Sequence, residues 1–489
     1  MAEFLTGFSN ILWGAPVLIL LGIVGLLYGI RTKFFQIRKM GYILKNTAGE
    51  MFKKGGGASG NKGTLTPLQA VCSALAGCVG TANIAGVATA MVIGGPGAVF
   101  WMWVIALLGM MTKCVEVTLG QYYRIQGKDG VYYGGPMYYI ERGMGMKWRW
   151  LAKIFAFFGM CVGLFGIGTF TQVNSISSAI TGFFDPEKNA TVSILGMDYS
   201  IFTVIGSIVL AVLVGLVVIG GLKRIAKVSE RVIPAMVVLY VGLSVLLIVT
   251  NLDKIPGAFV TIFESAFGLQ AAAGGMLGAI IIAMQKGIAR GIFSNEAGLG
   301  SAPIAAAAAQ TKEPVRQGLV SMTGTFWDTV VICALTGIVL VSTMLANPDI
   351  ASDILANPTV YSGAMLASEA FSKIPYIGTP ILVLGMVAFS YTTILGWSYY
   401  GNRCITYLFG RYAIRPYQVV YVAVAFLGAI GVGDIVWTIS DIGNALMAIP
   451  NIVVVLLLSG MIARETRHYV YDGNLDEPDD APIPQLEGK

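Results

Sequence analysis

Apolar stretches separated by short polar loops run along almost the whole chain, and eleven of them are long. Each approaches the ~20 residues that an α-helix needs to cross the hydrocarbon of a bilayer. The predicted spans lie at 11–30, 66–93, 97–118, 151–181, 201–221, 232–250, 271–297, 322–345, 376–402, 417–433 and 441–463. This pattern predicts an all-α integral membrane protein with eleven transmembrane helices.

Composition supports this class and excludes others. Of 489 residues, 56% are hydrophobic and 12% are charged, whereas a soluble domain carries about 25% charged residues. The net charge of +6 does not indicate a nucleic-acid partner, because the basic residues lie in short loops between apolar runs. The six cysteines form no CxxC pair, so we expect neither disulfides nor a metal centre.

The distribution of Lys and Arg predicts how the helices are oriented. If the first helix runs from outside to inside, the loops predicted outside carry only Lys188, Lys254 and Lys373, and the basic clusters fall inside. No basic region precedes the first apolar run, which argues for a retained helix rather than a cleaved signal peptide. We therefore expect a multi-pass protein of the cell membrane, with its N-terminus outside and its C-terminus cytoplasmic.

Two of the predicted helices are interrupted at their centres by small and polar residues. Residues 75–86 read Leu-Ala-Gly-Cys-Val-Gly-Thr-Ala-Asn-Ile-Ala-Gly, and residues 281–291 read Ile-Ile-Ala-Met-Gln-Lys-Gly-Ile-Ala-Arg-Gly. An unpaired backbone N–H or C=O is costly in hydrocarbon, so a helix breaks there only where the freed groups line a cavity. Two breaks in corresponding segments are typical of the binding site of a secondary transporter.

The two interrupted helices are the second and the seventh, five helices apart. Because five is odd, the second group of five helices would be inverted in the membrane relative to the first. We expect one extra N-terminal helix followed by a five-plus-five inverted repeat. The expected units are the first helix with a basic cytoplasmic loop at 1–65, the repeats at 66–250 and 271–463, and an acidic, disordered cytoplasmic tail at 464–489.

Two further stretches carry a family resemblance. Residues 94–109, Gly-Gly-Pro-Gly-Ala-Val-Phe-Trp-Met-Trp-Val-Ile-Ala-Leu-Leu-Gly, resemble the diagnostic motif of the alanine or glycine:cation symporter family. Residues 291–303, Gly-Ile-Phe-Ser-Asn-Glu-Ala-Gly-Leu-Gly-Ser-Ala-Pro, are also similar to that family. The resemblance implies the fold of the sodium-coupled leucine-type transporters and the uptake of small neutral amino acids with Na⁺ as coupling ion, without a cofactor.

The first interruption offers groups for both a cation and a carboxylate. A helix C-terminus presents bare carbonyls, which favour a cation, and an N-terminus presents bare N–H groups, which favour an anion. The residues expected to contribute are Ala76 and Val79 for Na⁺, and Gly80, Thr81, Ala82 and Asn83 for the substrate. The alternative is a glycine-rich packing face, since small residues at this spacing let helices approach closely.

The second interruption centres on Met284, Gln285 and Gly287, which we expect to face the substrate. Lys286 and Arg290 lie on one face of the same half-helix, and charges at membrane depth seek partners. A structural or gating ion-pair network is therefore expected for these two cations. The available acids are Glu116, Glu296 and Asp328. The position of Glu296, expected near the inner end of this helix, favours a cytoplasmic gate over a proton site.

Three other predicted helix segments complete the candidate site. By resemblance, Thr392 and Thr393 in 376–402 join the helix-two carbonyls around Na⁺, although isolated hydroxyls usually bond back to their own helix. Trp397 could close the pocket or mark a membrane interface. In 151–181, Phe170 and Gln172 could line the pocket, and Phe170 could instead be simple core. The external loop at 346–372 is expected to be either a lid or a stabilising cap.

The expected ligand is a neutral α-amino acid, because no acid is expected near either break to pair with a cationic side chain. The bulky candidates Met284, Phe170 and Trp397 favour a small side chain. The family resemblance implies alanine or glycine and Na⁺ as partners, and the lipid bilayer is expected as a further partner, without nucleic acid. A channel would favour a symmetric oligomer. An intramembrane enzyme would need a catalytic set, and the only histidine is His468 in the tail. A proton-coupled transporter of the same fold remains the alternative.

Overall fold

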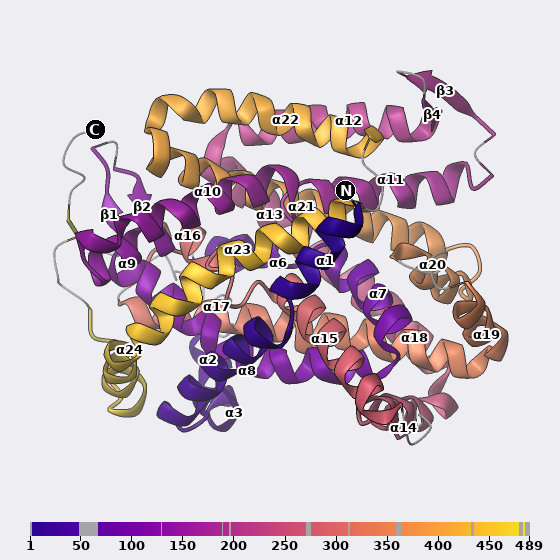
Figure 1. Ribbon diagram of the computed structural model, residues 1–489, viewed down its shortest axis with the longest axis horizontal. Helices are drawn as coiled ribbons and strands as arrows, with labels where there is room; N and C mark the ends of the chain where they lie inside the picture. The colour runs from indigo at the N-terminus through magenta and orange to yellow at the C-terminus, as the bar shows by residue number, and fades with distance from the viewer. Residues whose placement is uncertain are drawn as a thin grey trace.

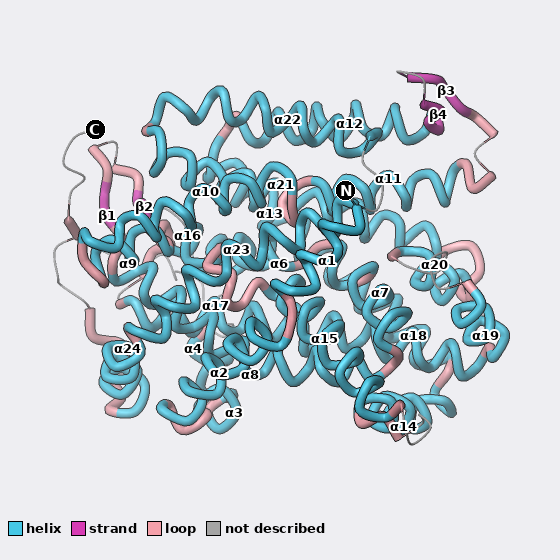
Figure 2. The backbone as a smooth tube through the Cα atoms, viewed as in Figure 1, coloured by secondary structure: helices cyan, strands magenta, loops and turns pink. Residues whose placement is uncertain are grey.

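The computed structural model describes residues 2–47, 67–128, 130–187, 189–194, 197–269, 275–311, 313–357, 363–431, 435–478 and 483–484. Helices account for nearly all of the described chain (Figure 1, Figure 2). Two short antiparallel hairpins lie at its edges: β1 (Ile125–Gln126) pairs with β2 (Tyr132–Tyr133), and β3 (Thr191–Ile194) pairs with β4 (Met197–Ser200). The architecture is therefore that of an α-helical bundle, as the hydrophobic pattern predicts.

The helices follow one another in this order. The first part contains α1 (Ala2–Leu12), α2 (Ala15–Arg31), α3 (Phe35–Arg38), α4 (Met40–Asn46), α6 (Pro67–Cys78), η1 (Thr81–Asn83), α7 (Ala85–Gly94), α8 (Gly97–Tyr122), α9 (Pro136–Gly143), η2 (Met146–Trp148), α10 (Arg149–Phe165), α11 (Phe170–Phe184), α12 (Ile201–Val218) and α13 (Gly221–Thr250). The second part contains η3 (Leu252–Lys254), α14 (Ile255–Ala266), α15 (Met276–Asn295), α16 (Ala302–Ala306), α17 (Pro314–Thr325), η4 (Phe326–Cys333), α18 (Ala334–Ala346), α19 (Pro348–Ala356), α20 (Ala364–Ser372), α21 (Gly378–Phe409), η5 (Arg411–Ala413), α22 (Ile414–Gly431), α23 (Ile435–Leu457), α24 (Ser459–Thr466) and η6 (Arg467–Tyr471).

Within the described residues, nine helical stretches are long and apolar enough to cross a membrane. They are Glu3–Arg31, Gly97–Tyr122, Met146–Phe184, Ile201–Val218, Gly221–Thr250, Met276–Asn295, Pro314–Ala346, Gly378–Phe409 and Trp437–Leu457. These stretches agree with nine of the predicted spans. The other two predicted spans correspond to the interrupted pair α6–α7 and to α22. The count of eleven and the inverted repeat remain predictions.

The interruption of the second predicted helix is confirmed. Helix α6 ends at Cys78, and α7 begins at Ala85. Between them, Thr81–Asn83 form one turn of 3-10 helix, and every residue of this stretch is buried. The C-terminal carbonyls of α6 and the N-terminal N–H groups of the following turn therefore lie inside the protein, where they need partners.

The predicted position of the second interruption is wrong. Residues 281–291 lie within α15, which is a continuous helix from Met276 to Asn295. The helix ends only at Glu296, which has a left-handed φ of 57°, and Gly298 and Gly300 follow with φ of 93° and 76°. These three positive φ values cannot continue a right-handed helix. The break therefore spans 296–301, and the next segment, α16, begins at Ala302.

Two more helices depart from regular geometry where the prediction expected continuous spans. The helix predicted at 151–181 is divided at residues 166–169 into α10 and α11. The helix predicted at 322–345 begins at Pro314 and contains the π-helical segment η4 at Phe326–Cys333. π-Helical turns are rare and occur frequently at functional sites. The centre of the bundle is thus irregular in four elements, not in two.

Close packing around α8 explains the glycine-rich motif at 94–109. An added Cβ at Gly97 would lie 2.3 Å from the backbone N of Ala266 in α14, and one at Gly109 would lie 2.9 Å from the Cβ of Ala297 in the second break. From the other side, an added Cβ at Gly287 of α15 would lie 2.3 Å from the carbonyl oxygen of Ala98. Small residues are therefore required for α8 to lie directly against the second interrupted helix.

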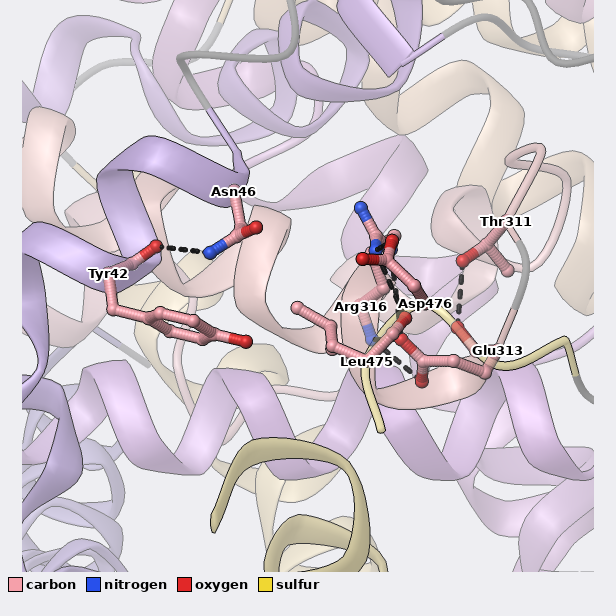
Figure 3. Close-up of polar contacts among 7 residues, drawn as sticks. All are labelled: Tyr42, Asn46, Thr311, Glu313, Arg316, Leu475 and Asp476. Atoms are coloured by element: carbon pink, nitrogen blue, oxygen red, sulfur yellow. Dashed lines mark hydrogen bonds and ion pairs between the residues drawn. The ribbon is translucent and has the colours of Figure 1, made fainter. Parts of the chain in front are cut away.

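The described part of the C-terminal tail is packed, contrary to the predicted disorder. Leu475 is 2% exposed, and its carbonyl accepts a hydrogen bond of 3.0 Å from the Arg316 guanidinium at the start of α17 (Figure 3). The same guanidinium donates to the Asp476 carboxylate at 2.7 Å. The Glu313 carboxylate accepts from the backbone N–H of Arg316 and so caps α17. The tail thereby contacts α17, the helix that follows α16.

The loop at 346–372, which the sequence predicts to be external, is largely helical where it is described. Helices α19 and α20 form most of it, and Leu366 and Phe371 of α20 are 1% and 0% exposed. The N–H of Gly363, just before α20, donates to the Thr89 hydroxyl of α7 at 2.9 Å. Helix α20 therefore rests on α7, the second half of the first broken helix; whether it acts as a lid or as a cap remains a prediction.

Candidate functional site

The backbone of the first break is held by side chains. The N–H of Gly80 donates to Asn83 Oδ1 at 2.9 Å, and the N–H of Thr81 donates to Gln172 Oε1 at 3.2 Å. Gly80 is needed for space, because an added Cβ there would lie 2.6 Å from Thr393 Oγ1 and 3.0 Å from Gln172 Oε1. Helix α11 and helix α21 thus meet at the first break. Gln172, Gly80, Thr81 and Thr393 lie together as predicted, and Ala82 follows them at 2% exposure.

The predicted cation ligands come together in part. The Thr393 hydroxyl donates to the Val79 carbonyl at 3.1 Å, across from α21 to the C-terminal end of α6. The Thr393 hydroxyl also lies within hydrogen-bond distance, 3.1 Å, of the Phe389 carbonyl of its own helix. The Thr392 hydroxyl donates to that same carbonyl at 2.9 Å. Ala76 lies one turn before Val79 and is fully buried. The pair formed by Val79 and Thr393 therefore gives neutral oxygen ligands at a negative helix end, which suits a hard monovalent cation.

An unexpected carboxylate completes the first break. Asn83 Nδ2 donates to Asp328 Oδ1 at 2.7 Å, while the hydroxyls of Ser294 and Thr329 donate to Asp328 Oδ2 at 2.7 and 2.6 Å. Asp328 is fully buried and lies in the π-helical segment η4. The expectation that no acid lies near either break is therefore wrong. It failed because Asp328 is distant in sequence and its reach depends on how η4 is wound.

The second break contains the other central acid. Glu296 Oε1 accepts a hydrogen bond of 2.6 Å from the Trp397 indole, and Glu296 Oε2 accepts one of 2.7 Å from the Ser301 hydroxyl. Glu296 and Trp397 are both fully buried. Trp397 is therefore not an interfacial residue, and Glu296 caps the C-terminal end of α15 at the second break. The contact connects α21, which carries Thr393 one turn earlier, to the second break.

A buried polar cluster contacts the backbone of the second break. Asn451 of α23 donates through Nδ2 to the Gly298 carbonyl at 2.9 Å and to the Glu116 carboxylate of α8, and it accepts from the Tyr139 hydroxyl. All four residues are inside the protein. The freed carbonyl of a positive-φ glycine thus has a side-chain partner, as a buried backbone group requires. Glu116 acts here as part of the scaffold of the break.

The structure does not bring the remaining predicted site residues to the first break. Met284 and Gln285 are half-buried on the continuous helix α15, and Gly287 is buried against Ala98 and Trp101 of α8. The Phe170 ring lies 5.5 Å from the Phe165 ring and against Gly428 of α22. These contacts are those of helix packing.

Arg290 of α15 has a different partner from the three acids expected. Arg290 forms a two-pronged contact with Asp441 of α23, with both nitrogen–oxygen distances at 3.2 Å. The guanidinium also lies 5.3 Å from the ring centroids of Phe293 and Trp437. Arg290 precedes the second break by less than two helical turns. The ion pair therefore joins α15 to α23 just before the central site.

Sequence reasoning did not name the buried Lys113. It named Glu116 and Asp328 but did not place them at the breaks. A signal for them existed, because ionisable residues within membrane-spanning helices are rare and mark functional sites by default. Within the part of the chain that the structure describes, no group of three or more His, Cys, Asp or Glu side chains converges on one point. The polar groups described at the two breaks are carbonyls, hydroxyls, amides, an indole N–H and single carboxylates.

Comparisons with known proteins agree with this picture. The sequence model of the sodium:alanine symporter family matches residues 1–479. The sodium/alanine symporter AgcS of Methanococcus maripaludis is 42% identical over 465 residues, which cover 94% of this chain and 95% of the relative. The probable sodium/glutamine symporter GlnT of Bacillus subtilis is 34% identical over 470 residues, which cover 96% of this chain and 90% of the relative.

A solved structure is similar in fold. The crystal structure of MhsT in complex with L-phenylalanine gives a TM-score of 0.56 at 15% sequence identity, covering 82% of this chain and 90% of that chain. At this identity the similarity shows the fold alone, which is that of the leucine-type transporters.

Proposed function

Because the chain belongs to the sodium:alanine symporter family, we propose that it carries alanine and glycine across the cell membrane together with Na⁺ by alternating access. Family membership makes the protein a Na⁺-coupled amino-acid symporter and not an enzyme. The observation that supports the proposal most is the contact between the Thr393 hydroxyl and the Val79 carbonyl at the first break. It joins two oxygen donors from separate helices at a negative helix end.

In the proposal, Na⁺ enters between Val79 and Thr393, with Ala76 and Thr392 as the other candidate ligands. Each helix end carries the equivalent of about half a charge, so carbonyl and hydroxyl oxygens there hold a monovalent ion loosely enough to release it. The absence of a formal charge on this ligand set favours a weakly held ion. Coupling follows because the same break also presents the substrate groups.

The substrate carboxylate is proposed to bind the N–H groups of Thr81 and Ala82. The Thr81 N–H now donates to Gln172 Oε1, and a carboxylate oxygen could take that place as Gln172 turns aside. The Asp328 carboxylate lies on the other side of Asn83 and offers a partner for the substrate ammonium. The N–H groups of Thr81 and Ala82 and the Asp328 carboxylate thus offer opposite charges to the two ends of a zwitterion. Met284, Gln285, Gly287 and Phe170 are not part of this proposed pocket; Trp397 is retained as its inner wall.

The test is uptake of radiolabelled alanine by purified protein in proteoliposomes, with and without an inward Na⁺ gradient. We expect uptake only with Na⁺, and competition by alanine, glycine and serine but little by leucine, glutamate or lysine. Strong competition by leucine, or by an amine without a carboxylate, would contradict the proposed pocket. Glutamine is included because the relative GlnT is named for it, and stronger competition by glutamine than by alanine would reassign the substrate.

Alternating access requires an outer closure, and the Arg290–Asp441 pair is proposed to provide it. The two side chains are 13% and 22% exposed, and removing one partner of a buried pair costs about 3–5 kcal/mol. We expect Arg290→Glu to reduce alanine uptake by at least ~10-fold. The double variant Arg290→Glu with Asp441→Arg should recover part of the loss. Equal uptake by the single and double variants would show that the pair has no gating role.

A proton-coupled carrier is the second candidate, and one observation favours it. Glu296 and Asp328 are buried carboxylates at the two breaks, where a proton could replace a cation. The same proteoliposomes distinguish the two candidates. Uptake driven equally well by a proton gradient in Na⁺-free buffer would support the proton mechanism and contradict Na⁺ binding at Val79 and Thr393.

A further inference from the structure

A lysine occupies the point where the two broken helices end. Lys113 of α8 is fully buried. Its ammonium donates to the Asn295 carbonyl at 2.6 Å and to the Cys78 sulfur at 2.8 Å. Asn295 is the last residue of α15, and Cys78 is the last residue of α6. One positive charge therefore contacts the C-terminal ends of both interrupted helices.

Two such helix ends form an electrostatic site for a cation. Each end carries the equivalent of about −0.5 charge, so the two together balance about one positive charge. The nearby acids Glu296 and Asp328 add to the negative field. Asn295 directly precedes Glu296, and its side chain donates to the Thr329 hydroxyl, which in turn donates to Asp328. The ammonium is thus embedded in the network that reaches Asn83.

Close packing of α8 against the second break brings the Lys113 ammonium to the Asn295 carbonyl. Gly109, one turn before Lys113, allows α8 to contact Ala297 of the break, where an added Cβ would lie 2.9 Å from the Ala297 Cβ. Val79, the carbonyl donor of the proposed Na⁺ site, follows Cys78 directly in the chain. Lys113 and the proposed Na⁺ site therefore serve neighbouring groups of one helix end.

We propose that the Lys113 ammonium is a tethered substitute for a second coupling cation. It fills the position between the two helix ends that a free cation would otherwise occupy, and it thereby fixes the coupling at one Na⁺ per amino acid. The inference rests on the proposed function, because coupling is counted per transported substrate. Without the ammonium, the Asn295 carbonyl and the negative ends of the two helices would attract a second Na⁺ from solution.

The experiment compares Lys113→Met with the unaltered protein in voltage-clamped proteoliposomes. The ratio of charge moved to radiolabelled alanine taken up should be about one for the unaltered protein, because alanine is a zwitterion and each translocated ion is driven by the membrane potential. In Lys113→Met, the ratio should approach about two, and the Na⁺ dependence should become steeper. Lys113→Arg keeps the charge and should retain the lower ratio. Lys373→Met removes a surface lysine and serves as the matched control.

Two results would overturn the inference. One is a ratio near two in the unaltered protein. The other is an active Lys113→Met variant with an unchanged ratio, since that would make Lys113 only a structural bridge. Failure of alanine uptake in the unaltered protein would instead contradict the proposed function.

A second measurement applies if Lys113→Met is inactive. The melting temperature of the purified variant should rise more steeply with Na⁺ than that of the unaltered protein, with no such difference when N-methylglucamine replaces Na⁺. This readout needs no amino acid, so it tests the vacated cation position directly. The same Na⁺ dependence for both proteins would overturn the inference.

Discussion

Replacing Thr393 by alanine is expected to raise the Na⁺ concentration for half-maximal alanine uptake by ~5- to 150-fold, from a lost ligand worth ~1–3 kcal/mol. The substitution removes the hydroxyl that contacts the Val79 carbonyl at 3.1 Å. Maximal uptake at saturating Na⁺ should fall less than the apparent affinity, because the backbone carbonyls of α6 remain. The measurement is initial uptake in proteoliposomes over a range of Na⁺ concentrations at constant ionic strength.

The neighbouring residue provides a matched control. The hydroxyls of Thr392 and Thr393 both reach the Phe389 carbonyl of their own helix, and that of Thr393 also reaches the Val79 carbonyl of α6. The effect of Thr392→Ala on the Na⁺ dependence should therefore be the smaller of the two. Thr393→Ser retains the oxygen and should preserve most of the Na⁺ affinity. An unchanged Na⁺ dependence in Thr393→Ala would remove the proposed cation site. A larger shift in Thr392→Ala would mean that Thr392 turns toward the ion when it binds.

Gly80→Ala is expected to reduce alanine uptake by ~5- to 150-fold, because overpacking of a filled site costs about 1–3 kcal/mol. The new methyl group would lie 2.6 Å from Thr393 Oγ1 and 3.0 Å from Gln172 Oε1. It would displace side chains from both the proposed cation site and the proposed carboxylate site. Initial uptake, normalised to the amount of reconstituted protein, measures the effect.

Gly86→Ala is the control on the same interrupted helix. Its added Cβ would meet only the Ala82 Cβ, at the ordinary contact distance of 3.5 Å. Uptake by this variant should remain close to that of the unaltered protein. Equal activity of the two variants would show that the close approach at Gly80 is not needed for transport.

The two interruptions illustrate what sequence reasoning could and could not predict. In residues 75–86, small residues coincide with the interruption between α6 and α7, and the break was predicted at the right place. In residues 281–291, the polar side chains of Gln285, Lys286 and Arg290 were interpreted as a break, although side-chain polarity alone does not end a helix. The real break contains Gly298 and Gly300 at positive φ. The glycine spacing in Asn-Glu-Ala-Gly-Leu-Gly-Ser was the informative signal.

Other features depend on contacts between segments that are far apart in sequence. The contact between Asp328 and Asn83 needs the π-helical winding of η4, for which no propensity rule exists. The partner of Arg290 is Asp441, 151 residues later, and it was not among the three acids considered from the sequence. By contrast, Thr393 was a candidate through the family resemblance and Gln172 through its glycine-rich helix segment, and the structure brings both to the first break. Local patterns thus identified the participating helices more reliably than the partners of their charges.

The two charged residues of α8, Lys113 and Glu116, have a consequence for the insertion of the protein into the membrane. Lys113 finds its carbonyl partner 182 residues later in the chain, and Glu116 finds Asn451 335 residues later. A charged side chain at the centre of a newly inserted helix costs about 2.5–3.5 kcal/mol on the translocon scale. We therefore expect α8 to enter the bilayer before the partners of its charges have been made, and to be stabilised there only after α15 and α23 have followed it. Truncation before α23 should accordingly weaken the insertion of α8.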